Sequence, residues 1–243
     1  AFYTDSFNTE RYLLEHGDFI RYDEDENLFY VYDGIAWRKN KRSLAMIKAK
    51  ETVLRLYGLI PHIADDDRRK RFSKHVADSE SLRAQKNIVD MARNFPPVII
   101  DNNRDYFDNH PYLLNCLDGT YNLLTDELQK HNPDDKITQV CPLKKERCAN
   151  STEWEMFLNT VTDGNQDLID YVQKICGYTL SGSTGAKLWF IVYGSTDTGK
   201  STFLNTILHV LGPDYGVMTE LDTLLTRANY RIPEGLFLMI KKC

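Results

Sequence analysis

The eight residues from Gly194 to Ser201, GSTDTGKS, follow the pattern G-x-x-x-x-G-K-[ST], which binds the phosphates of a nucleotide. Its glycines allow backbone angles at which successive N–H groups point inward at phosphate oxygens. A helix that begins near Lys200 would add the positive end of its dipole to the same anion. The residues that we expect to bind nucleotide are Gly194, Ser195, Thr196, Asp197, Thr198, Gly199, Lys200, Ser201 and Thr202.

Each side chain of this loop has an expected role in binding ATP and Mg²⁺. Lys200 should reach the β- and γ-phosphates as the catalytic lysine, and the Ser201 hydroxyl should bind the Mg²⁺ ion. Thr202 should support an inner phosphate. Asp197 places a carboxylate at the crown of the loop, so it must point outward if a γ-phosphate is to bind.

The sequence around the loop favours a strand before it and a helix after it. Six apolar residues, Leu188 to Tyr193, precede the loop and are typical of a buried parallel strand. After the loop, apolar residues follow helical spacing as far as Gly212-Pro213. This context favours a phosphate loop over a chance match.

Hydrolysis needs more than the loop, because an acidic residue after a neighbouring strand, a group that orients water and usually an arginine must act with it. The strand candidate after Gly212 is GLFLMI, residues 235–240, which is followed by Lys241 and Lys242 rather than by acids. We therefore expect this chain to bind ATP and to hydrolyse it only at background rates.

Composition excludes some functions for the 243 residues. The longest apolar runs have about six residues, whereas a membrane-spanning helix needs about 20, so no membrane partner is expected. The five cysteines lack the spacing of a metal site, and we interpret them as reduced thiols of a cytosolic protein.

Charge is unevenly distributed along the chain. Residues 1–33 carry nine acids and two bases, whereas residues 37–75 carry twelve bases and four acids. Such a basic stretch is typical of a DNA-contacting surface, and a solvated helix surface would give the same pattern. The candidate DNA contacts are Arg38, Lys39, Lys41, Arg42, Arg68, Arg69, Lys70 and Arg71.

Hydrophobic spacing and turn residues predict the elements that position these residues. A hairpin is expected in residues 28–37, helices at 41–58, 65–77 and 79–95, and short strands with turns in 111–143. Ser151 should cap the next helix, and residues 165–180 should form another. Trp154 and Phe157 could stack on single-stranded bases, but aromatic residues on a helix face more often belong to a core.

Several segments together resemble a known family. They are DGIAWRKN around Trp37, SLRAQKNIVDMARNFPPV (81–98), LLNCLDGTYNLLTDELQKHNPDDKITQ (113–139), WEMFLNTV (154–161), DLIDYVQKICGYTLSG (167–182) and GSTDTGKST (194–202). Their order resembles the C-terminal half of phage and plasmid primase–helicases, the superfamily 3 helicases that include poxvirus primase–helicases.

The resemblance implies an α/β architecture with three parts. Residues 1–149 would form a mostly helical α+β N-terminal module, and residues 150–183 a helical lead-in or collar. Residues 184–243 would form the first part of an AAA+-like P-loop ATPase domain. The chain departs from the family because it lacks the Walker B acids, the following sensor motif and the arginine finger. We therefore expect a truncated piece that ends where the second ATPase motif should begin.

The family resemblance also implies an activity and partners. Its members are enzymes that couple ATP hydrolysis to DNA unwinding in replication, as homo-hexameric rings, usually with a primase domain upstream. The expected partner is therefore DNA, and the expected location is the cytoplasm of a bacterial host cell or an equivalent compartment.

Two other functions stay open. The chain could be a non-catalytic DNA-binding or ring-assembly module with a vestigial nucleotide site, which Asp197 and the basic residues after Ile240 favour. A small-molecule kinase could share the loop, but such kinases place it near the start of the chain, whereas here most of the chain precedes it.

Overall fold

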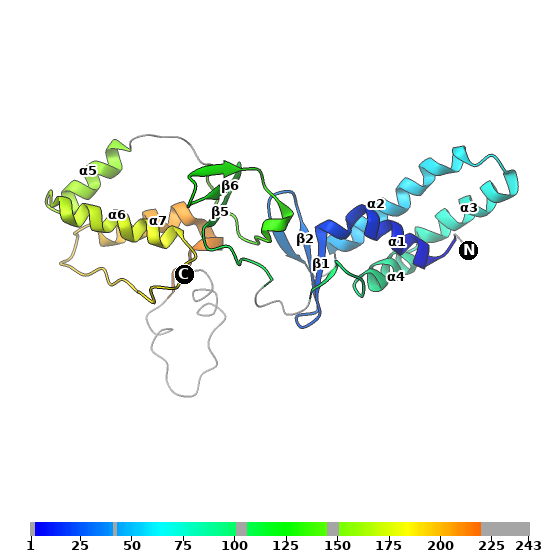
Figure 1. The fold of residues 1–243 in the computed structure, drawn as a ribbon, viewed down its shortest axis with the longest axis horizontal. Coiled ribbons are helices and arrows are strands. Elements are labelled where there is room, and N and C mark those ends of the chain that lie inside the picture. The colour runs from blue at the N-terminus through cyan, green and yellow to red at the C-terminus, as the bar shows by residue number, and fades with distance from the viewer. Residues whose placement is uncertain (1–2, 41–42, 101–105, 145–150, 220–243) are drawn as a thin grey trace, which may run out of the picture. The chain divides into compact units, whose positions relative to one another are not determined.

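The structure, a computed structural model, describes residues 3–40, 43–100, 106–144 and 151–219 (Figure 1). The chain forms two compact units. The first comprises residues 1–109 and 136–138, and the second comprises residues 110–135 and 139–243. The boundaries expected after residues 149 and 183 do not coincide with this division, and they stay predictions.

The first unit combines α-helices with a four-stranded sheet in the order β3-β2-β1-β4. Strands β1, β2 and β3 are antiparallel neighbours, and β4 pairs parallel to β1. Its elements are α1 (Asp5–His16), β1 (Ile20–Asp23), β2 (Leu28–Tyr32), β3 (Trp37–Asn40), α2 (Ser43–Leu56), the 3₁₀ helix η2 (Tyr57–His62), α3 (Asp66–Ser79), α4 (Leu82–Ala92) and β4 (Ile99–Ile100). The hairpin and the three helices predicted here are confirmed.

Side-chain caps explain where the helices of this unit begin. The Thr4 hydroxyl accepts a hydrogen bond from the Phe7 N–H, and the Asp65 carboxylate accepts one from the Arg68 N–H. Ser81 caps α4 in the same way. Each cap satisfies an N–H group that has no acceptor inside the helix.

The core of the first unit lies where α1, α2 and α4 pack together and meet the sheet. Small residues of α2, such as Ala45 and Ala49, let the other elements approach closely. A second cluster surrounds the buried Trp37, whose backbone N–H donates to the Ile137 carbonyl at 2.8 Å. Trp37 thereby ties residues 136–138 to this unit.

The second unit contains a three-stranded antiparallel sheet and three α-helices among the described residues. Its elements are β5 (Leu113–Cys116), β6 (Gly119–Asn122), β7 (Glu127–Gln129), α5 (Thr152–Val161), α6 (Gln166–Leu180) and α7 (Lys200–Tyr215). Ser151 caps α5, as predicted, and Asn165 caps α6, which was predicted only as a helix. The short strands expected between residues 111 and 143 are also confirmed.

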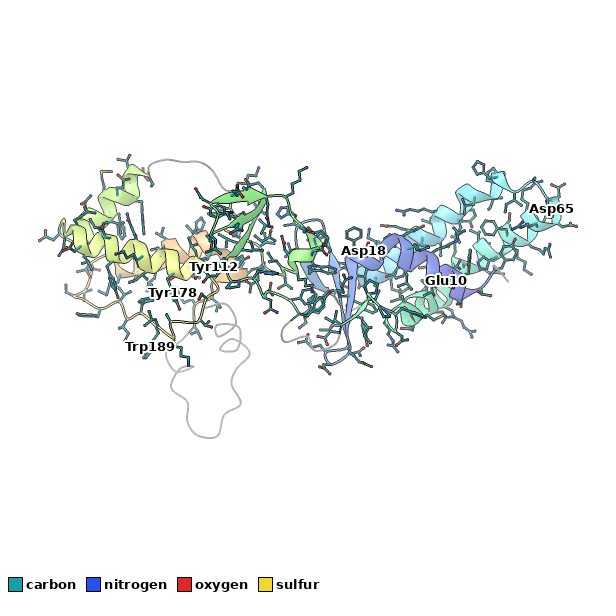
Figure 2. The ribbon with its side chains drawn as sticks, viewed as in Figure 1. Glu10, Asp18, Asp65, Tyr112, Tyr178 and Trp189 are labelled. Atoms are coloured by element: carbon teal, nitrogen blue, oxygen red, sulfur yellow. The ribbon has the colours of Figure 1, made fainter. Side chains whose placement is uncertain are left out.

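The buried strand predicted at Leu188–Tyr193 is absent from the structure. These residues form no strand, and their six side chains are 37–90% exposed. Figure 2 labels Trp189 on this loop segment, and the adjacent Phe190 ring meets the Tyr178 ring of α6 edge to face, with centroids 6.2 Å apart. A strand needs a neighbour for its backbone N–H and C=O groups, and none of the described strands pairs with these residues. The apolar pattern therefore identified a strand-forming sequence but not its partner.

Helix α7 begins at Lys200, as expected, and its regular part ends at Gly212, also as expected. Gly212 has non-helical backbone angles (φ 71°, ψ 177°), and a further short helical piece continues beyond this kink to Tyr215. None of the helices in the described ranges is long and apolar enough to cross a membrane.

Candidate nucleotide site

The backbone of the predicted phosphate loop turns at two residues with positive φ. Asp197 and Gly199 both adopt left-handed conformations, with φ of 61° and 81°. Only Gly199 is free of the strain that a side chain causes there. The Thr198 hydroxyl donates to the Ser195 carbonyl at 2.9 Å, which closes the turn.

The Lys200 ammonium group lies over the loop that precedes it. Its Nζ donates to the Gly194 carbonyl and to the Thr198 hydroxyl oxygen, each at 3.1 Å, and also to the Ser195 carbonyl. The ammonium group is therefore held against the loop residues 194–198. A phosphate oxygen that accepts a hydrogen bond from Nζ would replace one of these carbonyl or hydroxyl oxygens.

The N-terminus of α7 supplies further donors. Gly199 is its N-cap and offers no side-chain acceptor, and the first backbone bond of the helix runs from the Phe203 N–H to the Gly199 carbonyl at 2.9 Å. The N–H groups of Lys200, Ser201 and Thr202 thus precede the first intrahelical bond. Together with the dipole of this 16-residue helix, they suit an anion.

The remaining loop residues are accessible. Ser195, Thr196, Asp197, Ser201 and Thr202 are all exposed. The outward orientation expected of the Asp197 carboxylate stays a prediction. The magnesium role of Ser201 and the phosphate role of Thr202 stay predictions.

Helix α5 packs against the loop, which the sequence did not predict. The Trp154 ring stacks on Phe157 of the same helix, with centroids 5.3 Å apart, and on Phe203 in the first turn of α7, at 5.9 Å. These half-buried rings pack between α5 and the start of α7. The apolar spacing of Trp154, Phe157 and Val161 indicated one helix face but not the partner of that face.

The far end of α7 is tied to the small sheet. The Val140 N–H donates to Asp214 Oδ2 at 3.0 Å, and the Cys141 thiol donates to the Val210 carbonyl at 3.1 Å. An added Cβ at Gly212 would lie 2.4 Å from Pro142 Cδ, so only glycine allows this approach. The helix that starts at the phosphate loop therefore ends against the strand-and-turn segment.

The candidate DNA contacts lie at two places in the first unit and not on one surface. Arg38 and Lys39 are on β3, whereas Arg68, Arg69, Lys70 and Arg71 lie in the first turns of α3. Figure 1 shows the sheet and the start of α3 at opposite ends of this unit, and the label of Asp65 in Figure 2 marks the start of α3. Lys41 and Arg42 lie outside the described residues.

Carboxylates accompany several of these bases. Arg38 Nε lies 2.7 Å from Asp33 Oδ2, and Lys39 Nζ lies 2.5 Å from Glu26 Oε2. Burial alone would raise the pKa of Asp33, but hydrogen bonds from the Arg38 side chain and nearby backbone N–H groups lower it below its usual value. On α3, Arg69 pairs with Asp66. Arg68, Lys70 and Arg71 are exposed.

Other predicted features carry no site. Cys116 and Cys141 are buried and Cys176 is half-buried, while Cys148 and Cys243 fall outside the described residues. Asp65 caps α3. In the part of the chain that the structure describes, no three His, Cys, Asp or Glu side chains form a group that could hold a metal ion. The predicted strand at residues 235–240 also lies outside the described range.

A comparison with protein-family models gives one match. Residues 8–163, well over half of the chain, match the model described as D5 N terminal like. The matched segment runs from α1 to α5 and stops before α6, the phosphate loop and α7. No curated protein matches the chain.

Proposed function

The chain belongs to the D5 N-terminal-like family, the N-terminal region of D5-like primase–helicases, and on this premise we propose that it is the part of a DNA primase–helicase that binds ATP. The observation that carries the proposal is the position of Lys200. Its ammonium group lies over a loop whose backbone turns at Gly199 into the N-terminus of a long helix. Family and loop support the same function independently, because the family match does not include the loop.

The loop would hold Mg²⁺ and ATP through three kinds of groups. Backbone N–H groups at the start of α7 would bind phosphate oxygens, Lys200 would neutralise the outer phosphates, and the Ser201 hydroxyl would bind Mg²⁺. Bound Mg²⁺ would offset charge on the phosphates. In the complete protein, hydrolysis of this ATP would drive DNA unwinding by a homo-hexamer in the cytoplasm of the host cell. The isolated chain would hydrolyse ATP only at background rates.

An equilibrium titration with Mg²⁺ and ATP tests this function. Lys200→Ala should weaken binding by at least about a hundredfold, since it removes a charge that contacts phosphate directly. Lys174→Ala is a matched control, because Lys174 is an exposed lysine on the neighbouring helix α6. Equal affinity of the Lys200→Ala protein and the wild type would refute the assigned site.

A second candidate function is a DNA-binding or ring-assembly module that does not use nucleotide. The exposed apolar side chains of residues 188–193 favour it, since large exposed apolar segments often mark interaction surfaces. Native mass spectrometry with and without Mg²⁺ and ATP separates the two functions. Assembly and DNA binding that are indifferent to nucleotide would support the second.

A further inference from the structure

We propose that Phe157 and Val161 of α5 are positioning residues of the phosphate loop, an inference that rests on the proposed nucleotide binding. An added Cβ at Gly199 would lie 2.7 Å from Val161 Cγ1 and 3.1 Å from Phe157 Cε2. The two side chains therefore touch the backbone where the loop ends. Gly199 is needed here for two separate reasons, because its φ of 81° and this approach both exclude a side chain.

Gly199 is the residue whose placement controls the site. Its left-handed backbone turns the chain from the loop into α7, and the next residue is Lys200. A rotation at this turn would redirect both the lysine and the N–H groups of the first helical turn. Contact with two apolar side chains limits that rotation, so the donors stay aligned before the nucleotide arrives.

A second contact strengthens the same connection. Phe203 lies one turn into α7, and its N–H donates to the Gly199 carbonyl at 2.9 Å. The Phe203 ring stacks on Trp154 with an interplanar angle of 16°. Helix α5 thus holds both the last residue of the loop and the first turn of α7.

The positioning role can be separated from stability. Leu158, at 2% exposure, is the residue of α5 that is fully buried, whereas Val161 is 38% exposed and Phe157 is half-buried. Truncating Phe157 or Val161 therefore removes contacts at the edge of the packing and leaves the buried anchor of α5 in place. Nucleotide affinity should respond more strongly than the free energy of unfolding.

This helix is also the last element of the matched family region. Residues of the matched region would then contact the loop directly, although the loop lies outside that region. Nucleotide binding at the loop and the packing of α5 would then be linked, because each favours the same position of Gly199.

The test compares Phe157→Ala, Val161→Ala and Phe157→Leu with a control on the same helix. Met156→Ala is that control, because Met156 is 57% exposed and the atoms nearest to an added Cβ at Gly199 belong to Val161 and Phe157. We expect Phe157→Ala to weaken the binding of Mg²⁺ and ATP by about tenfold. Phe157→Leu should recover most of that loss, and Met156→Ala should bind as the wild type does. Thermal unfolding, measured in parallel, should change little in all four variants.

A spectroscopic readout distinguishes positioning from a general structural effect. Nucleotide should change the fluorescence of Trp154 with the same dissociation constant as binding. The fluorescence change should persist in Trp189→Phe and vanish in Trp154→Phe. This pattern would show that Trp154, of the three tryptophans, reports the binding.

The outcomes also separate this inference from the proposed function. If Lys200→Ala weakens binding while Phe157→Ala and Val161→Ala bind as the wild type does, the positioning role is wrong and the nucleotide site stands. If the wild type itself binds no nucleotide, both are wrong.

Discussion

The hydroxyl of Tyr215 accepts a hydrogen bond of 3.1 Å from the backbone N–H of Asn115. Tyr215 ends the helix that starts at the phosphate loop, and Asn115 lies in β5, the first strand of the small sheet. The side chain of Asn115 continues the connection, since its Nδ2 donates to the Gln139 carbonyl and its Oδ1 accepts from Thr120. One buried asparagine thus joins the sheet, the segment after it and α7.

Tyr215→Phe should lower the free energy of unfolding by about 1 kcal/mol, because it removes this acceptor while it keeps the ring. Tyr171→Phe is the matched control, since Tyr171 is 54% exposed on α6. Chemical denaturation of the three proteins measures the difference. Indistinguishable midpoints for Tyr215→Phe and the wild type would contradict the role given to this hydrogen bond.

Gly212→Ala should cost more than about 2 kcal/mol, because the substitution adds a side chain to a left-handed residue and forces it against Pro142. Gly58→Ala is the control, because an added Cβ there meets nothing within 4 Å and the backbone is not left-handed. The measurement is thermal unfolding. A Gly212→Ala protein as stable as the Gly58→Ala protein would show that α7 does not dock closely on the segment around Pro142.

Stability should fall as the pH drops below about 6.5, the ordinary pKa of histidine. Burial lowers the pKa of His16, and the charges of Glu15, Lys48, Glu51 and Arg55 around it partly offset one another. A histidine whose folded pKa is depressed binds fewer protons than it does in the unfolded chain. Its contribution is therefore complete above the unfolded pKa and is lost as the pH decreases from that value through the lower pKa of the folded state.

His16→Gln should flatten this pH dependence between about pH 5 and 7. His75, whose pKa burial also lowers, should leave a residual dependence. His209→Gln is the control, because His209 is exposed on α7. Denaturant midpoints across this pH range measure the effect, and an unchanged slope in His16→Gln would contradict it.

If DNA binds the first unit, the bases of α3 should matter more than those of β3. Lys70→Ala with Arg71→Ala removes two exposed charges, so it should lower the slope of log affinity against log salt by about 1.4 on single-stranded DNA. Arg38→Ala with Lys39→Ala should change it less, because both side chains already pair with carboxylates. Fluorescence anisotropy of labelled single-stranded DNA at several salt concentrations measures both. Equal slopes in the two double variants would contradict this ranking.

Local sequence rules predicted the parts of the fold that depend on local interactions. Ser81 and Ser151 cap helices where a short polar side chain precedes an apolar face. The Asp33-Gly34 turn forms the expected hairpin, with Tyr32 opposite Trp37. These features follow from hydrogen bonds and contacts within a few residues.

Features that depend on distant partners were not predictable in the same way. The apolar run from Leu188 to Tyr193 has the composition of a strand, but pairing depends on another segment of chain. The contact of Phe157 and Val161 with Gly199, and that of Pro142 with Gly212, join residues about 40 or more positions apart. The spacing of residues 194–201 predicts a phosphate loop, whereas the supports at both ends of α7 became visible only in the fold.

The most direct test of the central claim is the backbone amide spectrum of the ¹⁵N-labelled chain during a titration with Mg²⁺ and ATP. We expect saturable shifts at the amides of residues 194–202, largest at Gly199 and Lys200, with smaller shifts at Phe157 and Val161. The Lys200→Ala protein should lose these shifts over the same concentrations. A spectrum in which the loop amides stay unchanged at saturating nucleotide would contradict the account.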